Sequence, residues 1–99
     1  MMKHFDRETA EKRAETLKAL GHPIRLCIMD LLQDGERNVG DLAELLDIKS
    51  AIASQQLKLL RLSGLVAVEK RDGHSFYTIA HPNVPRLLDC LRTCDEVIK

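Results

Sequence analysis

Residues 39–63 read VGDLAELLDIKSAIASQQLKLLRLS, and two helical patterns lie on either side of a short turn in this segment. The apolar residues of the first pattern share one helical face and are Val39, Leu42, Ala43 and Leu46. Those of the second pattern do the same and are Ala53, Leu57 and Leu60. Between the two, Asp47-Ile48-Lys49 is predicted to form a tight turn, because Asp tolerates left-handed backbone geometry. The second helix is expected to run from about Ser50 to Ser63 and to stop at Gly64.

Two more amphipathic helices are predicted before this segment. The first runs from Asp6, its N-cap, to about Leu20, and its apolar residues are Ala10, Ala14 and Leu17. The second has Pro23 in its first turn and stops at Gly35. Its predicted inward stripe consists of Ile24, Cys27, Ile28, Leu31 and Leu32.

The period of the pattern changes after Gly64. Residues 65–70 and 75–80 are rich in β-branched and aromatic side chains. Asp72-Gly73 between them favours a β-hairpin, because Gly accepts the positive φ of a primed turn. A closing helix follows from about Val84, with Asn83 as its N-cap and Pro85 in its first turn. One side of this helix is expected to carry Leu87, Leu91, Cys94 and Ile98.

The predicted element order is therefore α-α-α-α-β-β-α. This is a mostly α fold with a β-hairpin (α+β), and the order is typical of a winged helix-turn-helix. A chain of 99 residues is expected to form a single domain, residues 1–99. Element order alone leaves one alternative open, a small α+β domain without a role in DNA binding.

Composition and charge restrict the functional class. Lys and Arg total 15, as do Asp and Glu, so the chain has no uniformly basic coat for nucleic acid. Residues 49–79 nevertheless carry five basic and two acidic side chains. Screening limits electrostatic reach to about 8 Å, so this local excess is what phosphate would meet. No apolar run approaches the ~20 residues of a membrane helix, and residues 1–11 contain no apolar signal segment, so a cytoplasmic location without a membrane partner is expected.

The second helix of a helix-turn-helix lies in the major groove of double-stranded DNA, so its exposed side chains are the candidate contacts. Gln55 is the preferred base-reading residue, because Gln bonds bidentately to adenine, and Gln56 is a weaker second. Further candidates on this helix are Ser50, Ala51, Ser54, Lys58 and Arg61. The hairpin tip supplies candidates for the DNA backbone or minor groove, namely Lys70, Arg71, Gly73 and His74. The alternative is an ordinary solvated helix face and a charged hairpin.

The closing helix has more apolar surface than so small a core needs. Its apolar residues are Leu87, Leu88, Leu91, Val97 and Ile98. Pairing of the first and last helices in a homodimer would bury this surface, and two recognition helices related by a two-fold axis would reach half-sites ~34 to 36 Å apart. Burial within one protomer is the alternative.

Three cysteines remain, and an odd number argues against a disulfide framework. Cys90 and Cys94 are four residues apart, so on a helix their Cβ atoms would be ~5 to 6 Å apart. That spacing suits a bridging soft metal, arsenite or extra sulfur atom better than a direct disulfide, and Cys27 would approach the pair from the second helix. The alternative is that these cysteines only pack as small hydrophobes.

The histidines and the absence of other motifs complete the chemistry. His81 is the histidine considered as a metal ligand, together with Cys94, whereas His22 before Pro23 is expected to be a cap or a surface residue. No resident cofactor is expected beyond a soft metal or metalloid acting as effector. A redox enzyme is not expected, because no C-x-x-C pair or suitably spaced base is present.

Several motifs together resemble those of the ArsR-type bacterial repressors. They are Leu20-Gly21-His22-Pro23-Ile24-Arg25-Leu26, Gly35-Glu36, Val39-Gly40-Asp41-Leu42, Ser54-Gln55-Gln56-Leu57, Leu60-Arg61, Gly64-Leu65-Val66 and the hairpin from Arg71-Asp72-Gly73 to Tyr77. The likeness covers about residues 15–98. It implies a homodimeric winged-helix repressor that releases operator DNA when a metal ion, a metalloid or an oxidised sulfur species binds.

The resemblance also bears on the effector. The Cys-Val-Cys motif of soft-metal sensors is replaced here by Asn38-Val39-Gly40. The positions that match zinc ligands of the family are His81, Asn83, Cys94 and Val97, and Asn83 and Val97 are poor ligands. Persulfide-sensing members use one Cys in the second helix and one in the last, and Cys27 with Cys90 or Cys94 is similar, although Cys27 lies one turn earlier.

These observations together predict a DNA-binding repressor whose operator binding is released by an effector that acts on Cys thiols. Reactive sulfur, a metalloid and a soft metal are the effector classes considered. Two alternatives stay open, a constitutive winged-helix regulator whose cysteines are structural only and a winged-helix module that binds protein instead of DNA.

Overall fold

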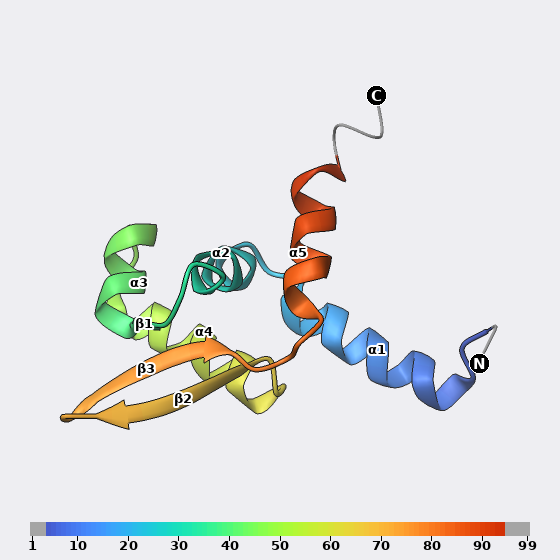
Figure 1. Cartoon of the computed structure of the whole chain (residues 1–99), viewed down its shortest axis with the longest axis horizontal. Coiled ribbons are helices and arrows are strands. Elements are labelled where there is room, and N and C mark those ends of the chain that lie inside the picture. The colour runs from blue at the N-terminus through green and yellow to red at the C-terminus, as the bar shows by residue number, and fades with distance from the viewer. Residues whose placement is uncertain (1–3, 95–99) are drawn as a thin grey trace.

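The computed structural model describes residues 4–94 and shows a winged helix-turn-helix (Figure 1). Its elements in chain order are α1 (Arg7–Leu20), α2 (Pro23–Leu32), β1 (Arg37–Asn38), α3 (Val39–Leu46), α4 (Ser50–Leu62), β2 (Val66–Arg71), β3 (His74–Ile79) and α5 (Val84–Arg92). The predicted α+β class and the predicted helices and hairpin are confirmed. The order differs by one element, because β1 was not predicted.

β1 completes a three-stranded antiparallel sheet with the order β1-β3-β2. In this sheet Arg37 pairs with Tyr77, and Val66 pairs with Ile79. β1 is only two residues long, so it has no alternating pattern to detect, and it forms because the chain before α3 runs along the free edge of β3. The hairpin of β2 and β3, called the wing below, turns at Asp72 (φ 52°) and Gly73 (φ 79°), which confirms the predicted primed turn.

The hydrophobic core lies where α2, α3, α4 and the foot of the wing meet (Figure 1). Its largest fully buried side chains are Ile28, Met29, Leu42, Leu57, Leu60 and Leu65. The buried residues of α3 and α4 are Leu42, Ala43, Ala53, Leu57 and Leu60, all of which were predicted to face inward. The turn between these helices has Asp47 in the left-handed region (φ 54°), also as predicted.

The inward side of α2 was predicted incorrectly in one respect. Cys27 is exposed, whereas Met29 and Ile28 are fully buried. The core-facing side of α2 is therefore rotated toward Met29. Apolar residues occupy most positions of this helix, so the periodicity of the sequence did not determine which of them face the core.

The N-caps of the helices agree with prediction at two of three positions. The Thr9 N–H donates to Asp6 Oδ1 at 2.7 Å, and this bond lowers the pKa of the Asp6 carboxyl. His22 caps α2 by accepting the Ile24 N–H at its Nδ1 (3.1 Å). Asn83 does not cap α5 with its side chain, because its backbone is already helical (φ −96°, ψ −4°) and an N-cap needs extended geometry.

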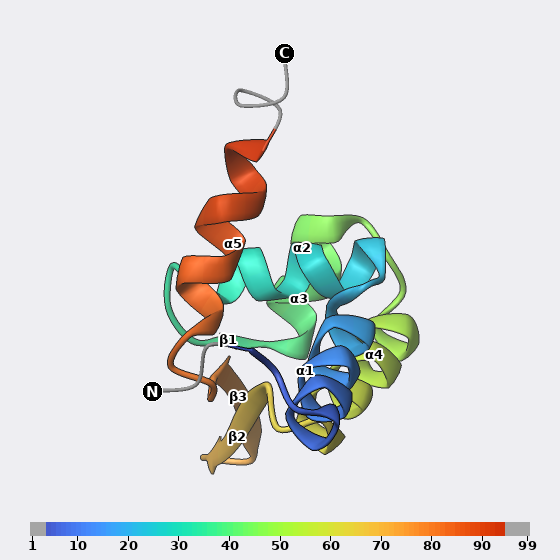
Figure 2. The ribbon, with the colours of Figure 1, turned by 90° about the vertical axis from the view of Figure 1, so that its right-hand side faces the viewer.

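α1 and α5 extend away from the body formed by α2, α3 and α4 (Figures 1 and 2). On α1 the predicted apolar residues Ala10, Ala14 and Leu17 are exposed, and Leu20 at its end is buried. On α5 the buried residues are Val84 and Leu88, and of the predicted line Leu87 packs half-buried against the core, whereas Leu91 and Cys94 are exposed. Val97 and Ile98 lie outside the described residues. Among the helices described, none is long and apolar enough to cross a membrane.

The burial of α4 yields a stability prediction. Leu57→Ala is expected to lower the free energy of unfolding by about 2 to 5 kcal/mol, because Leu57 is fully buried and the change leaves a cavity. Leu62→Ala is the matched control on the same helix, since Leu62 is 68% exposed, and its effect is expected to stay within about 0.5 kcal/mol. Urea denaturation measures both values, and equal effects would contradict the packing described here.

Candidate nucleic-acid interface

The outward side of α4 is fixed by the residues that the helix buries. Ala53, Leu57 and Leu60 are each fully buried. Successive residues of an α-helix are about 100° apart, so the opposite side carries a stripe of four residues. These residues, called the outward stripe below, are Ala51, Gln55, Lys58 and Leu62, and all four are exposed. The predicted base-reading residue Gln55 therefore lies where a partner surface would meet α4.

The turn before α4 presents the start of this helix to solvent. Asp47 takes the left-handed geometry, and the Ile48 N–H donates to the Ala43 carbonyl oxygen at 3.0 Å. Lys49 occupies the N-cap position of α4 but provides no side-chain cap. The positive end of the helix dipole thus begins at an exposed lysine, an arrangement that favours an anion such as phosphate.

The remaining predicted contacts of α4 lie on its two flanks. Ser50, Ser54 and Arg61 are exposed on one flank. Gln56 lies on the other flank, is half-buried, and its Oε1 accepts a hydrogen bond from Arg25 Nη1 at 3.1 Å. The two adjacent glutamines therefore differ in kind: Gln55 is exposed on the outward stripe, whereas Gln56 contacts α2.

Some charged side chains of the wing form ion pairs, and others are exposed to solvent. Arg71 is paired with Glu36 and, at 3.0 Å between Nε and Oε1, with Glu69, and its guanidinium carbon lies 4.3 Å from the centroid of the Phe76 ring. The hydrogen bond to Glu36 raises the pKa of Arg71. Lys70 and His74 are exposed near the tip. Arg71 thus fastens the wing to the segment before β1, a role that the sequence did not indicate because Glu36 is 35 residues away.

The three cysteines are all exposed, but they lie in different surroundings. Cys27 lines a cleft of about 250 Å³ between α2 and α5, together with Leu26, Asp30, Leu88, Leu91 and Arg92. Cys90 lies on α5. α5 ends at Arg92 with Thr93 as its C-cap, and Cys94 follows this C-cap. The predicted bridging of Cys90 and Cys94 by an effector stays a prediction.

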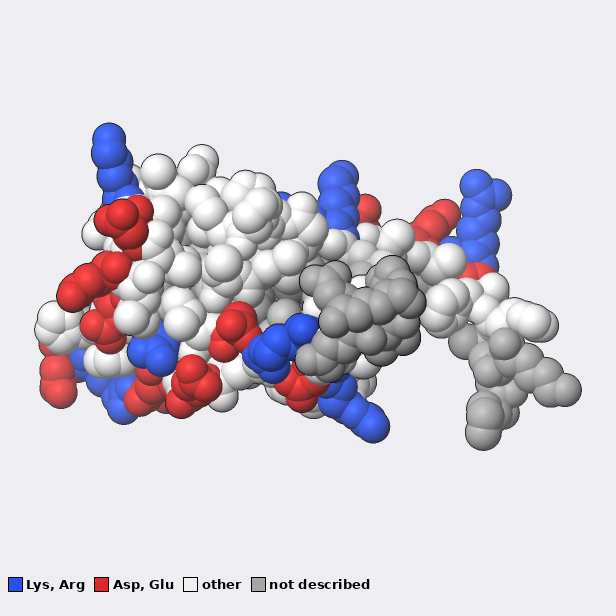
Figure 3. Space-filling view, turned by 90° about the horizontal axis from the view of Figure 1, so that it is seen from above, with Lys and Arg blue, Asp and Glu red and all other residues white. Residues whose placement is uncertain are grey.

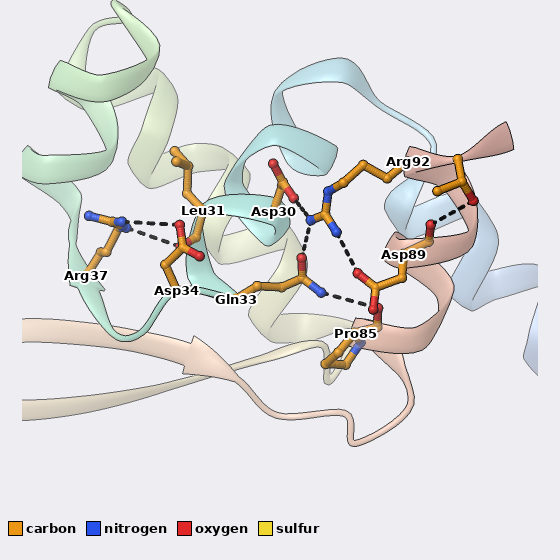
Figure 4. Close-up of polar contacts among 9 residues, drawn as sticks. Asp30, Leu31, Gln33, Asp34, Arg37, Pro85, Asp89 and Arg92 are labelled. Carbon is orange, nitrogen blue, oxygen red and sulfur yellow. Dashed lines mark hydrogen bonds and ion pairs between the residues drawn. The ribbon is translucent and has the colours of Figure 1, made fainter. Parts of the chain in front are cut away.

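Arg92 forms the polar connection between α2 and α5 (Figure 4). Its guanidinium bonds to Asp30 and Gln33 of the α2 end and, at 2.5 Å, to Asp89 on its own helix. Gln33 Nε2 also donates to the Pro85 carbonyl oxygen at 3.2 Å. The hydrogen bond to Asp30 raises the pKa of Arg92. This network borders the Cys27 cleft, and its partners are about 60 residues apart in sequence, so no local pattern indicates it.

His81 lies in a groove between α1 and α5. The groove has a volume of about 410 Å³ and is lined by Phe5, Arg13, Thr16, Leu17, His81, Asn83, Val84 and Leu87. His81 Nδ1 accepts the Asn83 N–H at 3.3 Å. Between residues 4 and 94, no three His, Cys, Asp or Glu side chains are grouped so that they could hold a metal ion. The predicted ligands His81 and Cys94 are therefore not joined by a third ligand in that part of the chain.

The upper surface of the molecule is largely uncharged in its middle (Figure 3). Figure 3 shows this surface from above, and uncharged side chains cover much of its middle, over α2 and α3, with Asp and Glu gathered toward one end. No continuous basic area is visible there. The exposed basic side chains of α4 and the wing, by contrast, all belong to residues 49–79, where basic residues outnumber acidic ones. This arrangement identifies α4 and the wing as the candidate surface for a nucleic acid.

Comparisons with known proteins agree with this geometry. Residues 22–68 match the family model described as "Bacterial regulatory protein, arsR family". The chain is 37% identical over 94 residues to a biofilm growth-associated repressor of Xylella fastidiosa, with 91% of this chain and 82% of that protein covered. The structure of HlyU from Vibrio cholerae N16961 superposes with a TM-score of 0.84 at 31% identity, covering 90% of this chain and 97% of that chain.

A further solved structure is described as a homodimeric winged helix-turn-helix DNA-binding domain, Mb0332 from Mycobacterium bovis, a possible ArsR-family transcriptional regulator. It superposes with a TM-score of 0.80 at 33% identity, and the match covers 97% of this chain and 91% of that chain. The winged helix-turn-helix arrangement is therefore shared along nearly the whole length of both chains.

The outward stripe generates a prediction about sequence reading. Gln55→Ala is expected to weaken binding to a duplex that the wild-type protein selects from a random pool by about 1 to 3 kcal/mol, and to affect a scrambled duplex much less. Lys58→Ala is expected to weaken both and to lower the salt slope by about one. Fluorescence anisotropy at several salt concentrations measures both effects. Equal losses on the two duplexes for Gln55→Ala would refute its role as a base reader.

Proposed function

This chain belongs to the ArsR family of bacterial regulatory proteins, and from that premise we propose that it is a homodimeric transcriptional repressor that releases its operator when an effector acts on cysteine thiols. Its relatives are named as transcriptional regulators, not as enzymes, and it is a DNA-binding regulator of the same kind. The specific operator, the dimer and the thiol effector are the parts that we propose.

The observation that carries operator binding is the outward stripe of α4. Gln55 and Lys58 are exposed on a helix whose opposite side is fully buried, so their position relative to the body is fixed by packing. A recognition helix held in this way can enter the major groove, with Gln55 toward a base edge and Lys58 toward phosphate. Lys70 and His74 on the wing would then approach the adjacent backbone.

The support for a homodimer is the exposed apolar surface of α1 and α5. Leu17 is 59% exposed and lines the groove between these helices with Phe5 and Leu87. A second copy that places its own α1 against this groove would bury such side chains in a symmetric contact. The Mycobacterium bovis neighbour is described as homodimeric, which favours the same assembly here.

The support for a thiol effector is the exposure of Cys27 in the cleft between α2 and α5. A group added to this sulfur would occupy the cleft beside Arg92, which connects the two helices. Because α5 belongs to the proposed dimer interface, a shift of α5 would change how the two recognition helices are spaced. Couplings of about 1 to 3 kcal/mol are common in allosteric proteins and are enough for release. Cys90 on α5 is the first candidate for a second thiol in this mechanism, and Cys94 is the other candidate.

The proposed dimer can be tested by a charge placed in the groove. Leu17→Glu is expected to convert a dimer into a monomer at micromolar concentration, because it places a carboxylate in the apolar interface. Leu45→Glu on α3 is the matched control, since Leu45 is 55% exposed and lies away from the groove, and it should leave the dimer intact. Sedimentation velocity measures both. A wild-type protein that stays monomeric would contradict the proposal.

The thiol switch can be tested by titrating the protein–duplex complex with zinc, cadmium, arsenite and a persulfide donor. Cys27→Ser, and separately the double variant Cys90→Ser with Cys94→Ser, should still bind the selected duplex, but release by the effective compound should be lost. Intact mass recorded for each mixture separates a bound metal ion from an added sulfur.

Two other outcomes of this titration have a defined meaning. If a variant in which all three cysteines are replaced by serine responds to the compounds like the wild type, the proposed thiol effector is wrong. If the wild type responds to none of the compounds, the protein is a constitutive regulator. Binding that does not weaken with salt would instead indicate a module for protein partners, because duplex binding releases counterions.

A further inference from the structure

We infer that Arg25 is a positioning residue that sets the spacing of the two recognition helices, and this inference rests on the proposed operator binding by a dimer. Arg25 lies on α2 and bonds to two other helices. Its Nε donates to the Ala19 carbonyl oxygen near the end of α1 at 2.6 Å. Its Nη1 donates to Gln56 Oε1 on α4 at 3.1 Å. One side chain thus connects the proposed dimer helix to the recognition helix.

α1 has few other contacts that would hold its direction. Leu20 is the buried residue of this helix, and Ala19 packs against the core beside it. Nearly all residues before Ala19 are exposed, so α1 is held mainly at its C-terminal end (Figure 1). Gly21 follows there, and a Cβ at this position would lie 3.2 Å from the Leu17 carbonyl oxygen. The direction of α1 relative to α4 is therefore set by the few residues around Ala19 and Gly21. The side chain of Arg25 provides the hydrogen bonds that link α1 and α4 to α2 there.

The length of α1 makes this junction sensitive. A helix of 14 residues is about 21 Å long, so a tilt of about 10° at one end moves the other end by about 4 Å. Successive base pairs are separated by about 3.4 Å. In a dimer that pairs through α1, a small tilt at the junction would shift the two recognition helices by about one base pair relative to each other.

The polar contacts of Arg25 suit this role better than apolar packing does. Hydrogen bonds from a guanidinium are directional and stronger than those between neutral groups, so they fix an angle as well as a distance. Both bonds are partly buried, which protects them from competition with water. Gln56 is the acceptor on α4 and lies about 100° around the helix from Gln55. Gln56 therefore positions α4, while Gln55 on the outward stripe reads the base.

The test compares duplexes that differ only in the distance between half-sites. A duplex selected by the wild-type protein is rebuilt with one base pair inserted or removed at its centre, and a single half-site serves as reference. The wild type should prefer the selected spacing by about tenfold or more, and Arg25→Met should reduce that preference to about threefold or less. Gln56→Met should do the same while leaving the Arg25 bond to Ala19 in place. Affinity for the single half-site should change much less in both variants.

Matched variants separate positioning from folding and from base reading. Gln56→Glu keeps an acceptor for Arg25 and should retain the spacing preference. Gln55→Ala should weaken binding to every specific duplex but keep the preference. Arg25→Met combined with Gln56→Met should resemble Arg25→Met alone, because the two side chains act through one bond. Thermal unfolding of each variant shows whether it is folded.

The outcomes distinguish this inference from the proposed function. A loss of affinity that is equal for all spacings and for the single half-site, with a lowered melting temperature, would mean that Arg25 is only structural and would overturn the inference. A spacing preference that Gln56→Met leaves unchanged would overturn it as well. A wild-type protein that selects no duplex would refute the proposed function itself, and Arg25 would then have no recognition helix spacing to set.

Discussion

The burial of one side of α4 is the constraint on which the rest of the structure depends. Ala53, Leu57 and Leu60 are fully buried, and they pack where α2, α3 and the foot of the wing converge (Figure 1). Because a helix is a rigid cylinder, burying these residues forces the outward stripe to face away from the body. The orientation of the candidate reading residue thus follows from hydrophobic packing, and the polar groups of α4 are left free to meet a partner.

Arginines connect the elements at the edge of this core. Arg25 joins α2 to the end of α1 and to α4, Arg71 joins the wing to Glu36, and Arg92 joins α5 to α2 (Figure 4). These elements also contribute buried apolar residues to the core, namely Leu20, Val66, Val84 and Leu88. A guanidinium reaches across several ångströms and offers several donors, so it can connect elements that share little apolar contact. The helices held in this way, α1 and α5, are the ones assigned to the dimer in the proposed function.

Ion pairing of arginine reduces the number of basic side chains that are available to bind phosphate. Residues 49–79 contain more basic than acidic side chains, but Arg71 in that segment is paired with Glu36 and Glu69. Lys58, Arg61 and Lys70 are exposed and take part in none of the ion pairs found between residues 4 and 94. The basic groups that would meet phosphate are therefore fewer than the sequence suggests, and they lie on α4 and near the tip of the wing.

The sequence by itself determined the winged helix-turn-helix. Periodic apolar residues define α3 and α4, and Asp47 and Asp72-Gly73 mark the two turns, because these features act within a few residues of one another. The same local information placed Gln55 on the exposed side of α4. The tertiary structure alone decided that Cys27 is exposed, that β1 pairs with β3, and that Gln56 bonds to Arg25. The β1 pairing and the Gln56 bond depend on segments that are far apart in the chain, and the exposure of Cys27 depends on how an evenly apolar helix is rotated. Neither cause leaves a periodic signal in the sequence.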